Sequence, residues 1–272
     1  MNTHWKPTLT FTRFRRKHYE LNRLYWTQYL GYKALNTALQ HLPDSELTIT
    51  HIAPELPQKQ HLHTVAETRE WAEEYLSRSR LHLLVICSAN LESYLQEITF
   101  WHIANLGHLK TGVYQLTSVG KALGNPILGK ASLPQPLKYA QDLFQLSFGN
   151  DLTVWQRSYK LRCAAAHNGG IVTARTLRDI PDLDDGINAP IGIDWPTFKT
   201  SLAAAENIAK TIDQKVSNKK LRILEVRREL EELKEISQLP DLSNLWSYIH
   251  HSFGLKGLTN AEKREIEASI YK

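Results

Sequence analysis

The chain has 272 residues, 42% hydrophobic and 22% charged, which is ordinary for a globular protein large enough to bury a core. Its formal charge of +5 is compatible with a polyanionic partner such as RNA but does not indicate one by itself. Cys87 and Cys163 have no paired or metal-type spacing, which argues against a disulfide framework and favours a reducing compartment. No apolar stretch approaches the roughly 20 residues that cross a bilayer, and no secretory signal is evident. We therefore expect a soluble, cytoplasmic protein without a membrane partner.

The first part of the chain predicts two amphipathic helices separated by a loop. Apolar residues recur every three or four positions over 19–42, the period of a helix with one buried face. Prolines and polar residues fill 43–63, which indicates a loop. A longer helical pattern covers 64–107, and it opens with Thr64 and Glu67 at the spacing of a capping box. Its apolar middle predicts a bundle core, with Cys87 as a small core residue.

The middle of the chain predicts a third long helix between two connections. Glycines and prolines make 107–136 a connection, and a short helix is expected over 136–146. Asp151 or Thr153 is then expected to cap the third long helix. This helix should end at 168–170, Asn-Gly-Gly, because glycine readily adopts the left-handed conformation of a helix C-cap.

The last third of the chain predicts further helices. A turn-rich stretch over 176–196 leads to Asp194, which precedes Trp-Pro and so marks a helix start. The helix is expected to run to about residue 237. Its later part, 219–234, mixes apolar residues with charges of both signs, which favours a surface helix or a short hairpin arm, with a coiled-coil contact as the alternative. A small helical tail over 242–271 is anchored by aromatic and aliphatic residues: Trp246, Tyr248, Ile249 and Phe253.

No segment alternates as a strand does, so the predicted fold class is all-α. We expect a helical core over 64–217. An N-terminal helix and linker over 1–63 would pack on this core, and 218–272 would form a helical extension. The alternative is that all three segments form one continuous domain.

An arginine and a histidine mark the end of the third long helix. Arg162 and His167 have the spacing Arg-x4-His, directly before Asn-Gly-Gly-Ile-Val. The bare spacing is uninformative, because a chain with 12 histidines and this many arginines should contain roughly one such pair by chance. A second pair, Arg13 and His18, does occur in the basic N-terminal segment. Only the first pair lies at the end of an apolar-faced helix, and this context favours it.

The stretch 159–172, Tyr-Lys-Leu-Arg-Cys-Ala-Ala-Ala-His-Asn-Gly-Gly-Ile-Val, resembles the signature of the HEPN superfamily. In that family a helix bears Arg-x4–6-His, followed by a polar residue, a glycine and an aliphatic pair. The segment 88–95 resembles the family's earlier long helix and aligns Glu92 with a buried acidic residue. The resemblance covers about residues 64–215 and implies a HEPN-like bundle of about four to five core helices, with N- and C-terminal helical extensions.

For function, the resemblance implies a homodimeric endoribonuclease that needs no metal or cofactor and cuts RNA in a toxin, stress or anti-phage role. An antitoxin or other regulatory protein is then a further expected partner. RNA supplies its own nucleophile, the ribose 2′-hydroxyl. His167 would transfer the proton, since histidine changes charge near neutral pH. Arg162 would present a permanent forked charge to the phosphate oxygens.

Two neighbours of this pair are expected to support it. Asn168 provides the polar position after the histidine. Cys163 follows the arginine, where active family members often carry a polar residue, and a thiol donates only weakly. This departure from the pattern puts full activity in doubt.

Other interpretations of the pair stay open. Arg162 could form a surface ion pair, and His167 could be favoured by the helix dipole, which contributes about 0.3–1 kcal/mol. The chain would then be a non-catalytic HEPN module that binds RNA, a nucleotide or a partner protein, or a purely structural helical dimer.

Four basic residues are candidates for contacts with RNA phosphates: Arg13, Arg15, Arg16 and Lys160. A solvated N-terminus is the alternative for the first three. Two histidine pairs lack carboxylate or cysteine partners at ligand-like spacing: His61 and His63, and His250 and His251. No metal site is therefore predicted.

Overall fold

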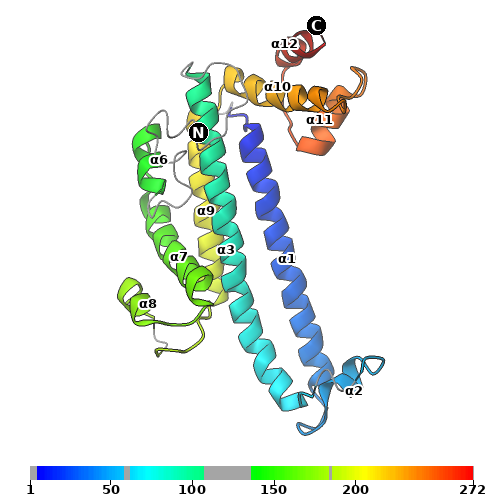
Figure 1. The fold of residues 1–272 in the computed structure, drawn as a ribbon, viewed down its shortest axis with the longest axis vertical. Helices are drawn as coiled ribbons and strands as arrows, with labels where there is room; N and C mark the ends of the chain where they lie inside the picture. Colours follow the sequence, from blue (N-terminus) through cyan, green and yellow to red (C-terminus); the bar gives the residue numbers. More distant parts are fainter. Residues whose placement is uncertain (1–4, 58–61, 107–135, 184–185, 272) are drawn as a thin grey trace. The chain divides into compact units, whose positions relative to one another are not determined.

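A computed structural model of the protein describes residues 5–57, 62–106, 136–183 and 186–271. Within these residues the chain forms α-helices and no strand, which confirms the predicted all-α class (Figure 1). The expected connection 107–136 lies almost entirely outside the described residues. The described helices, in chain order, are α1 (Leu9–Leu39), α2 (Thr48–Ile52), α3 (Val65–Asn105), α6 (Pro136–Phe144), α7 (Gly149–Asn168), α8 (Ala174–Asp179), α9 (Trp195–Val216), α10 (Lys219–Glu235), α11 (Leu245–Phe253) and α12 (Asn260–Ile270).

The chain divides into two compact units, each built from segments far apart in the sequence. Unit 1 contains 1–18, 89–153 and 204–272, and unit 2 contains 19–88 and 154–203. Each of the helices α1, α3, α7 and α9 therefore contributes to both units. The division at 63/64 and 217/218 expected from the sequence stays a prediction. In the described part of the chain, no helix combines the length and apolar character needed to cross a bilayer.

Two of the predicted helix starts in unit 2 are confirmed by their capping hydrogen bonds. Thr64 donates its backbone N–H to the Glu67 carboxylate over 2.9 Å, and the Glu67 N–H bonds the Thr64 hydroxyl over 3.3 Å. This is the reciprocal pattern of a capping box. At the start of α9 the Thr197 N–H bonds the Asp194 carboxylate over 2.8 Å. Both helices begin at the predicted positions because their own first turns supply the acceptors.

The predicted start of the first helix is wrong. α1 begins at Leu9, ten residues before the expected start at residue 19. The segment that carries Arg13 is therefore helical, and Phe11 and Phe14 are buried in it. Both rings lie against Tyr94 of α3, with centroids 6.2 and 5.3 Å away. The basic N-terminal segment is part of the unit 1 core.

The amino end of α1 is capped by two buried carboxylates from the far end of the chain. Thr8 donates its N–H and its hydroxyl to Asp213 of α9, and the Trp5 indole donates to the same carboxylate over 2.9 Å. Glu225 of α10 accepts from the Leu9 N–H at 2.8 Å and from the hydroxyl of Thr10 at 2.6 Å. Side chains are normal partners for the N–H groups that a helix start leaves unpaired.

Burial sets the ionisation of these two capping groups. Both carboxyls are almost inaccessible to solvent, and charged carboxylates are disfavoured where water is excluded. Burial raises the pKa of Glu225 to about 8, against the opposing hydrogen bonds from Thr10 and Leu9. It raises the pKa of Asp213 to about 6, against the hydrogen bonds from Thr8 and Trp5. The neutral forms are favoured because the cost of burying a charged carboxylate exceeds the stabilisation from the threonine hydrogen bonds.

The expected continuous helix from 195 to about 237 is interrupted. α9 ends at Val216, and α10 begins at Lys219 with Asn218 as its N-cap. The Asn218 side chain accepts from the Leu221 N–H over 3.0 Å. The Ser217 hydroxyl donates to the carbonyl of Lys6. Both are polar contacts that a helix interior would not provide.

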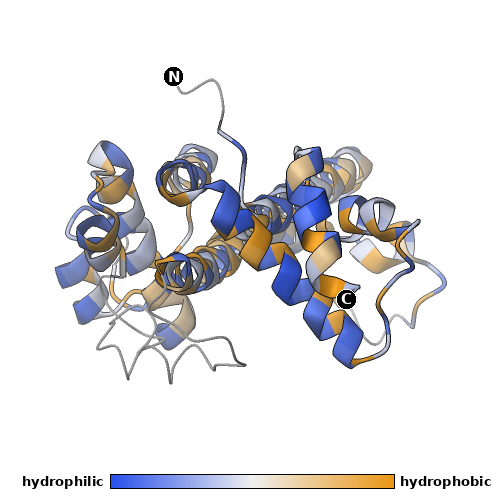
Figure 2. Ribbon diagram, turned by 90° about the horizontal axis from the view of Figure 1, so that it is seen from above, coloured by the Kyte–Doolittle hydropathy of each residue, from blue (hydrophilic) through white to orange (hydrophobic). Residues whose placement is uncertain are grey.

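α10 has one exposed, charged face, as its sequence predicted, and one buried face. It lies with α11 and α12 in unit 1, and each of these helices carries both hydrophobic and hydrophilic residues (Figures 1 and 2). Their apolar faces share one core with the start of α1. The core residues are Leu9, Ile223, Val226, Leu230, Leu245, Ile249, Leu255, Ile266 and Ile270. Ile249 is therefore a confirmed anchor of the helical tail, whereas Trp246 and Phe253 are half-buried against this core.

The core of unit 2 lies along the first part of α3. Leu81, Leu84 and Cys87 are buried there, as predicted for the apolar middle of this helix. At the start of α9, Trp195 stacks on Tyr25 of α1 with ring centroids 4.6 Å apart and planes at 8°. These contacts join α1 and α9 within unit 2, to which the later part of α7 also belongs.

Candidate functional site

One face of α7 is buried in unit 2. The buried residues are spaced by three positions, as expected for one stripe of a helix: Trp155, Ser158, Leu161 and Ala164. The Ser158 hydroxyl bonds that of Ser201 on α9 over 2.6 Å. Arg162 and Cys163 are half-buried beside this stripe, and His167 is exposed in the last turn. The expected caps Asp151 and Thr153 were placed wrongly, since the helix already begins at Gly149.

The carboxyl end of α7 is closed as the sequence predicted. Gly169 and Gly170 have φ of +63° and +74°, in the left-handed region. The Gly170 N–H reaches back to the carbonyl of Ala164 over 3.3 Å, so one of the carbonyl groups that the helix end leaves unpaired is satisfied. Asn168 is the last helical residue and is half-buried. The two glycines thus end the helix one residue after His167 and fix where the imidazole leaves it.

The residues after the glycines are held by a segment that the sequence did not flag. Val172 donates to the carbonyl of Ala189 over 2.9 Å, and Ile191 donates to that of Gly170 over 2.7 Å. Val172 and Ile191 are fully buried. Between them lies α8, capped by Thr173, in a stretch read as turns alone. Val172, the second residue of the aliphatic pair, therefore anchors the end of α7, whereas Ile171 is exposed.

Arg162 and His167 leave α7 in different directions. Five residues of an α-helix rotate a side chain by about 140° from its starting direction and advance it by about 7.5 Å. The Arg162 guanidinium lies 5.4 Å from the ring centroid of Tyr159, a cation–π contact, and its Nη1 is 4.0 Å from Cys163 Sγ. His167 makes no hydrogen bond or ion pair with the described residues. One copy of the helix therefore presents an accessible imidazole and a separately oriented guanidinium.

The other residues expected near this pair have different settings. Glu92 is half-buried on α3 and belongs to unit 1, and its supporting role stays a prediction. Lys160 is exposed on α7. A hydrogen bond from Arg157 lowers the pKa of Asp182, and the charge of Lys160 contributes in the same direction. Arg157 and Asp182 therefore form an ion pair on this surface, and Lys160 makes no ion pair with the described residues.

The N-terminal arginines are largely engaged within unit 1. Arg13 forms a forked ion pair with Glu229 and lies 3.4 Å from Glu97. Arg15 approaches Glu206 at 3.5 Å, and Arg16 donates to the carbonyl of Ser252. Arg13 is half-buried and ion-paired, and its contact with RNA phosphates stays a prediction. The exposed Arg15 and Arg16 keep that role as a prediction.

The histidine pairs provide no metal centre among the described residues, where no group of three or more ligand-type side chains gathers. His63 packs on Trp71, with ring centroids 4.0 Å apart. His250 and His251 contact each other at the end of α11. His61 lies outside the described residues.

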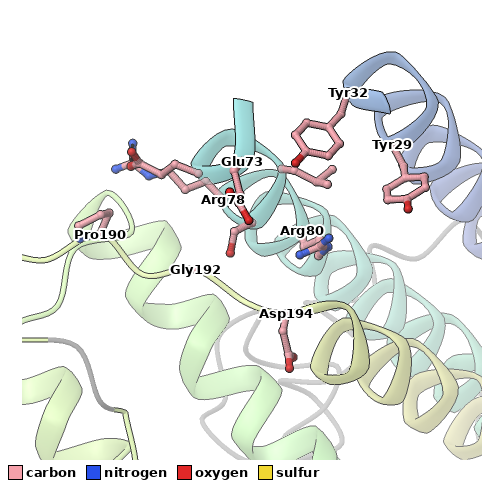
Figure 3. Close-up of a pocket in the computed structure, with 11 residues that line it drawn as sticks. Tyr29, Tyr32, Glu73, Arg78, Arg80, Pro190, Gly192 and Asp194 are labelled. Carbon is pink, nitrogen blue, oxygen red and sulfur yellow. Dashed lines mark ion pairs between the residues drawn. The ribbon is translucent and has the colours of Figure 1, made fainter. Parts of the chain in front are cut away.

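Sequence reasoning missed a cavity of about 600 Å³ in unit 2. Tyr29 and Tyr32 of α1 lie on one side of it, Arg80 of α3 lies beside them, and Asp194 lies before α9 (Figure 3). The only local signal was a pair of tyrosines one helical turn apart. The connection over 190–194 completes the lining, and nothing in the sequence places that connection against α3.

Comparison of the chain with models of known protein families, with curated proteins and with solved structures gives no match. The arrangement of the residues therefore carries the functional argument.

Proposed function

We propose that the protein is a HEPN-like endoribonuclease in which His167 transfers protons and Arg162 stabilises the phosphate. The observation that carries the proposal is the exposed imidazole of His167, which no described residue engages, at a helix end fixed by two left-handed glycines. A histidine that is packed for structural reasons would have a partner. An accessible imidazole is what proton transfer at a phosphodiester requires.

The proposed reaction breaks the P–O5′ bond by attack of the neighbouring ribose 2′-oxygen. One imidazole accepts the 2′-hydroxyl proton, and a protonated imidazole donates a proton to the departing 5′-oxygen. The products are a 2′,3′-cyclic phosphate and a 5′-hydroxyl, so atoms and charge balance without a covalent enzyme intermediate. The guanidinium of Arg162 stabilises the negative charge that grows on the non-bridging oxygens.

The active unit in this proposal is a homodimer. The directions of Arg162 and His167 differ by about 140° around α7, so a single helix does not aim both side chains at one phosphate without bending the arginine around it. Two copies would supply one histidine as base and the other as acid. An RNA-cutting role in toxicity, stress or anti-phage defence, held in check by a regulatory protein, is the biological setting that the HEPN resemblance implies.

The test is cleavage of total RNA and of a defined oligonucleotide in the presence of a chelator. Wild type should release fragments ending in a cyclic phosphate, and His167→Ala and Arg162→Ala should each abolish this. His82→Ala is the matched control, because His82 is another exposed histidine of unit 2, and it should cut as wild type does. Intact RNA with wild type, or equal cutting by all variants, overturns the proposal.

A second candidate function is RNA binding without cleavage. The contacts of the guanidinium favour it, because Arg162 lies over Tyr159 and against Cys163 rather than projecting freely. In this case wild type and His167→Ala would bind single-stranded RNA equally and neither would cut it. Restoring a polar residue by Cys163→Asn would separate the two functions if it produces cleavage.

A further inference from the structure

The cavity of unit 2 is bounded by three elements of the chain. Figure 3 shows Tyr29 and Tyr32 projecting from α1, Glu73 and Arg80 on α3, and the connection before α9 beyond them. Its volume of about 600 Å³ falls within the range of pockets that hold small ligands or single groups of larger ones. All of its lining residues belong to unit 2, as the α7 motif does.

Several polar groups that line the cavity have unused hydrogen-bonding capacity. Arg80 donates through Nη1 to the carbonyl of Ile193 over 3.1 Å, but its Nε is buried and meets no acceptor among the described residues. A buried donor without an acceptor is unfavourable, and an acceptor on a ligand would relieve that cost. The hydroxyls of Tyr29 and Tyr32 make no hydrogen bond with described residues. The lining therefore offers both donors and acceptors to a ligand.

The carboxylates of the lining differ in what they already bind. Glu74 is paired with Arg78 at 3.3 Å, whereas Glu73 has no ion pair with the described residues. The Thr197 hydrogen bonds lower the pKa of Asp194, so that carboxylate stays charged near neutral pH. Glu73 is thus an available acceptor at the mouth of the cavity.

The charges decide which part of a nucleotide the cavity fits. Three carboxylates and two guanidinium groups line it, so the balance is negative and disfavours a phosphate inside. A base is favoured instead, because aromatic rings stack on any base. A carboxylate accepts from the N1–H and amino group of guanine, and arginine donates to guanine O6 or N7. Glu73 and Arg80 carry this pair of complementary functions.

A place for the phosphate exists outside the cavity. The Lys33 ammonium lies 5.6 Å from the Tyr29 ring centroid and 5.9 Å from that of Tyr32. Lys33 is exposed and does not line the cavity. A nucleotide stacked on these rings would therefore bring its phosphate to a cation at the rim.

The cavity is also tied to the end of α7 through the backbone. The connection that lines the cavity at Pro190 and Gly192 is the one that bonds the tail of the motif helix, through Ile191 to Gly170. Gly192 lies so close to α3 that an added Cβ would meet the Ser77 hydroxyl at 2.3 Å. A side chain there would collide with Ser77, so glycine allows the connection to lie directly against α3.

We propose that this cavity binds an unpaired guanine of single-stranded RNA, stacked on Tyr29 or Tyr32 and held by Glu73 and Arg80. That the ligand is RNA rests on the proposed function. The recognition of a base rather than a phosphate rests on the lining itself. The site would select where on an RNA the α7 motif acts.

The test measures binding of labelled single-stranded RNA to the full-length His167→Ala protein by fluorescence anisotropy. Oligonucleotides with a central guanine run and with a uridine run are compared. The oligonucleotide with guanines should bind about tenfold more tightly than the one with uridines, because that is the affinity expected from one base that is stacked and hydrogen-bonded at its edge. Tyr29→Ala with Tyr32→Ala should remove most of this advantage. Tyr75→Ala, on α3 and 65% exposed, is the matched control and should bind as the parent does.

A second variant keeps the test meaningful where the tyrosine changes disturb folding. Glu73→Gln alters one exposed side chain. It should weaken the binding of guanine RNA about tenfold and leave the binding of uridine RNA unchanged. The inference is overturned by equal binding of the two RNAs, or by binding that none of these changes affects. Its failure is separable from that of the nuclease. If guanine RNA binds preferentially but wild type does not cut RNA, the base-binding cavity is supported and the nuclease is not. If wild type cuts RNA and Glu73→Gln does not change the cutting, the nuclease is supported and the cavity is not.

Discussion

The buried caps of α1 predict that the protein loses stability as the pH rises from 5 to 7. The pKa of Glu225 is raised from 4.5 to about 8, and that of Asp213 from 3.8 to about 6. At a pH between the unfolded-state and folded-state pKa of each group, the unfolded chain has released a proton that the folded chain retains. The stability that these groups contribute is therefore complete below pH 4 and is lost as the pH passes through the folded-state values.

The magnitude follows from linkage. Each proton held only by the folded state changes the free energy of unfolding by about 1.4 kcal/mol per pH unit. In the folded protein Glu225 retains its proton from pH 5 to pH 7, which is two pH units. Asp213 retains its proton from pH 5 to pH 6, which is one pH unit. Together the two groups give a loss on the order of 4 kcal/mol. Burial lowers the pKa values of His18 and His102, which opposes part of this loss over the same range, so we expect a net loss on the order of 3 kcal/mol.

Urea unfolding followed by circular dichroism at pH 5, 6 and 7 measures this loss. Glu225→Gln should remove most of the pH dependence, since the amide cannot ionise. Glu235→Gln changes an exposed carboxylate on the same helix and should keep it. A wild-type stability that is constant or rises over this range, or a slope that Glu225→Gln leaves intact, would refute the reasoning.

Three further outcomes are expected. Gly170→Ala should lower the free energy of unfolding by about 1–2 kcal/mol, because alanine is strained at a φ of +74°; in urea titrations Gly31→Ala, inside α1 with open space around it, should instead raise stability by about 0.5–1 kcal/mol. Cys163 should react with a thiol reagent in the folded protein, whereas Cys87 should react only in denaturant, because burial raises its pKa to about 12; two equally fast thiols would contradict this. His167→Ala should leave the free energy of unfolding within about 0.5 kcal/mol of wild type, since the side chain is exposed, and a larger loss would indicate a structural role.

Helix ends were predictable where the signal is local. Thr64 and Glu67 form their capping box, and Gly169 and Gly170 close α7, because each motif supplies its own hydrogen-bond partners within a few residues. The start of α1 was missed because its caps, Asp213 and Glu225, lie more than 200 positions away. No pattern within the first twenty residues records those partners.

The candidate site was predictable only as a sequence motif. The pattern identified Arg162 and His167 but not that their directions diverge around α7. It also did not reveal that the connection at 188–191 anchors the helix end, since that pairing joins segments separated by α8. The cavity residues Tyr29 and Arg80 come from different helices, and their juxtaposition is a product of the tertiary fold.

The caps of α1 also bear on how the protein is made. Translation proceeds from the amino end of the chain, so Leu9 and Phe11 leave the ribosome long before Asp213 and Glu225 are synthesised. Until then the first helix has an unsatisfied amino end and exposed apolar side chains, and closing contacts of such long range is slow. Unit 1 therefore reaches its native arrangement only after α10, α11 and α12 have been translated. During that interval the apolar residues of the first helix stay open to non-native contacts.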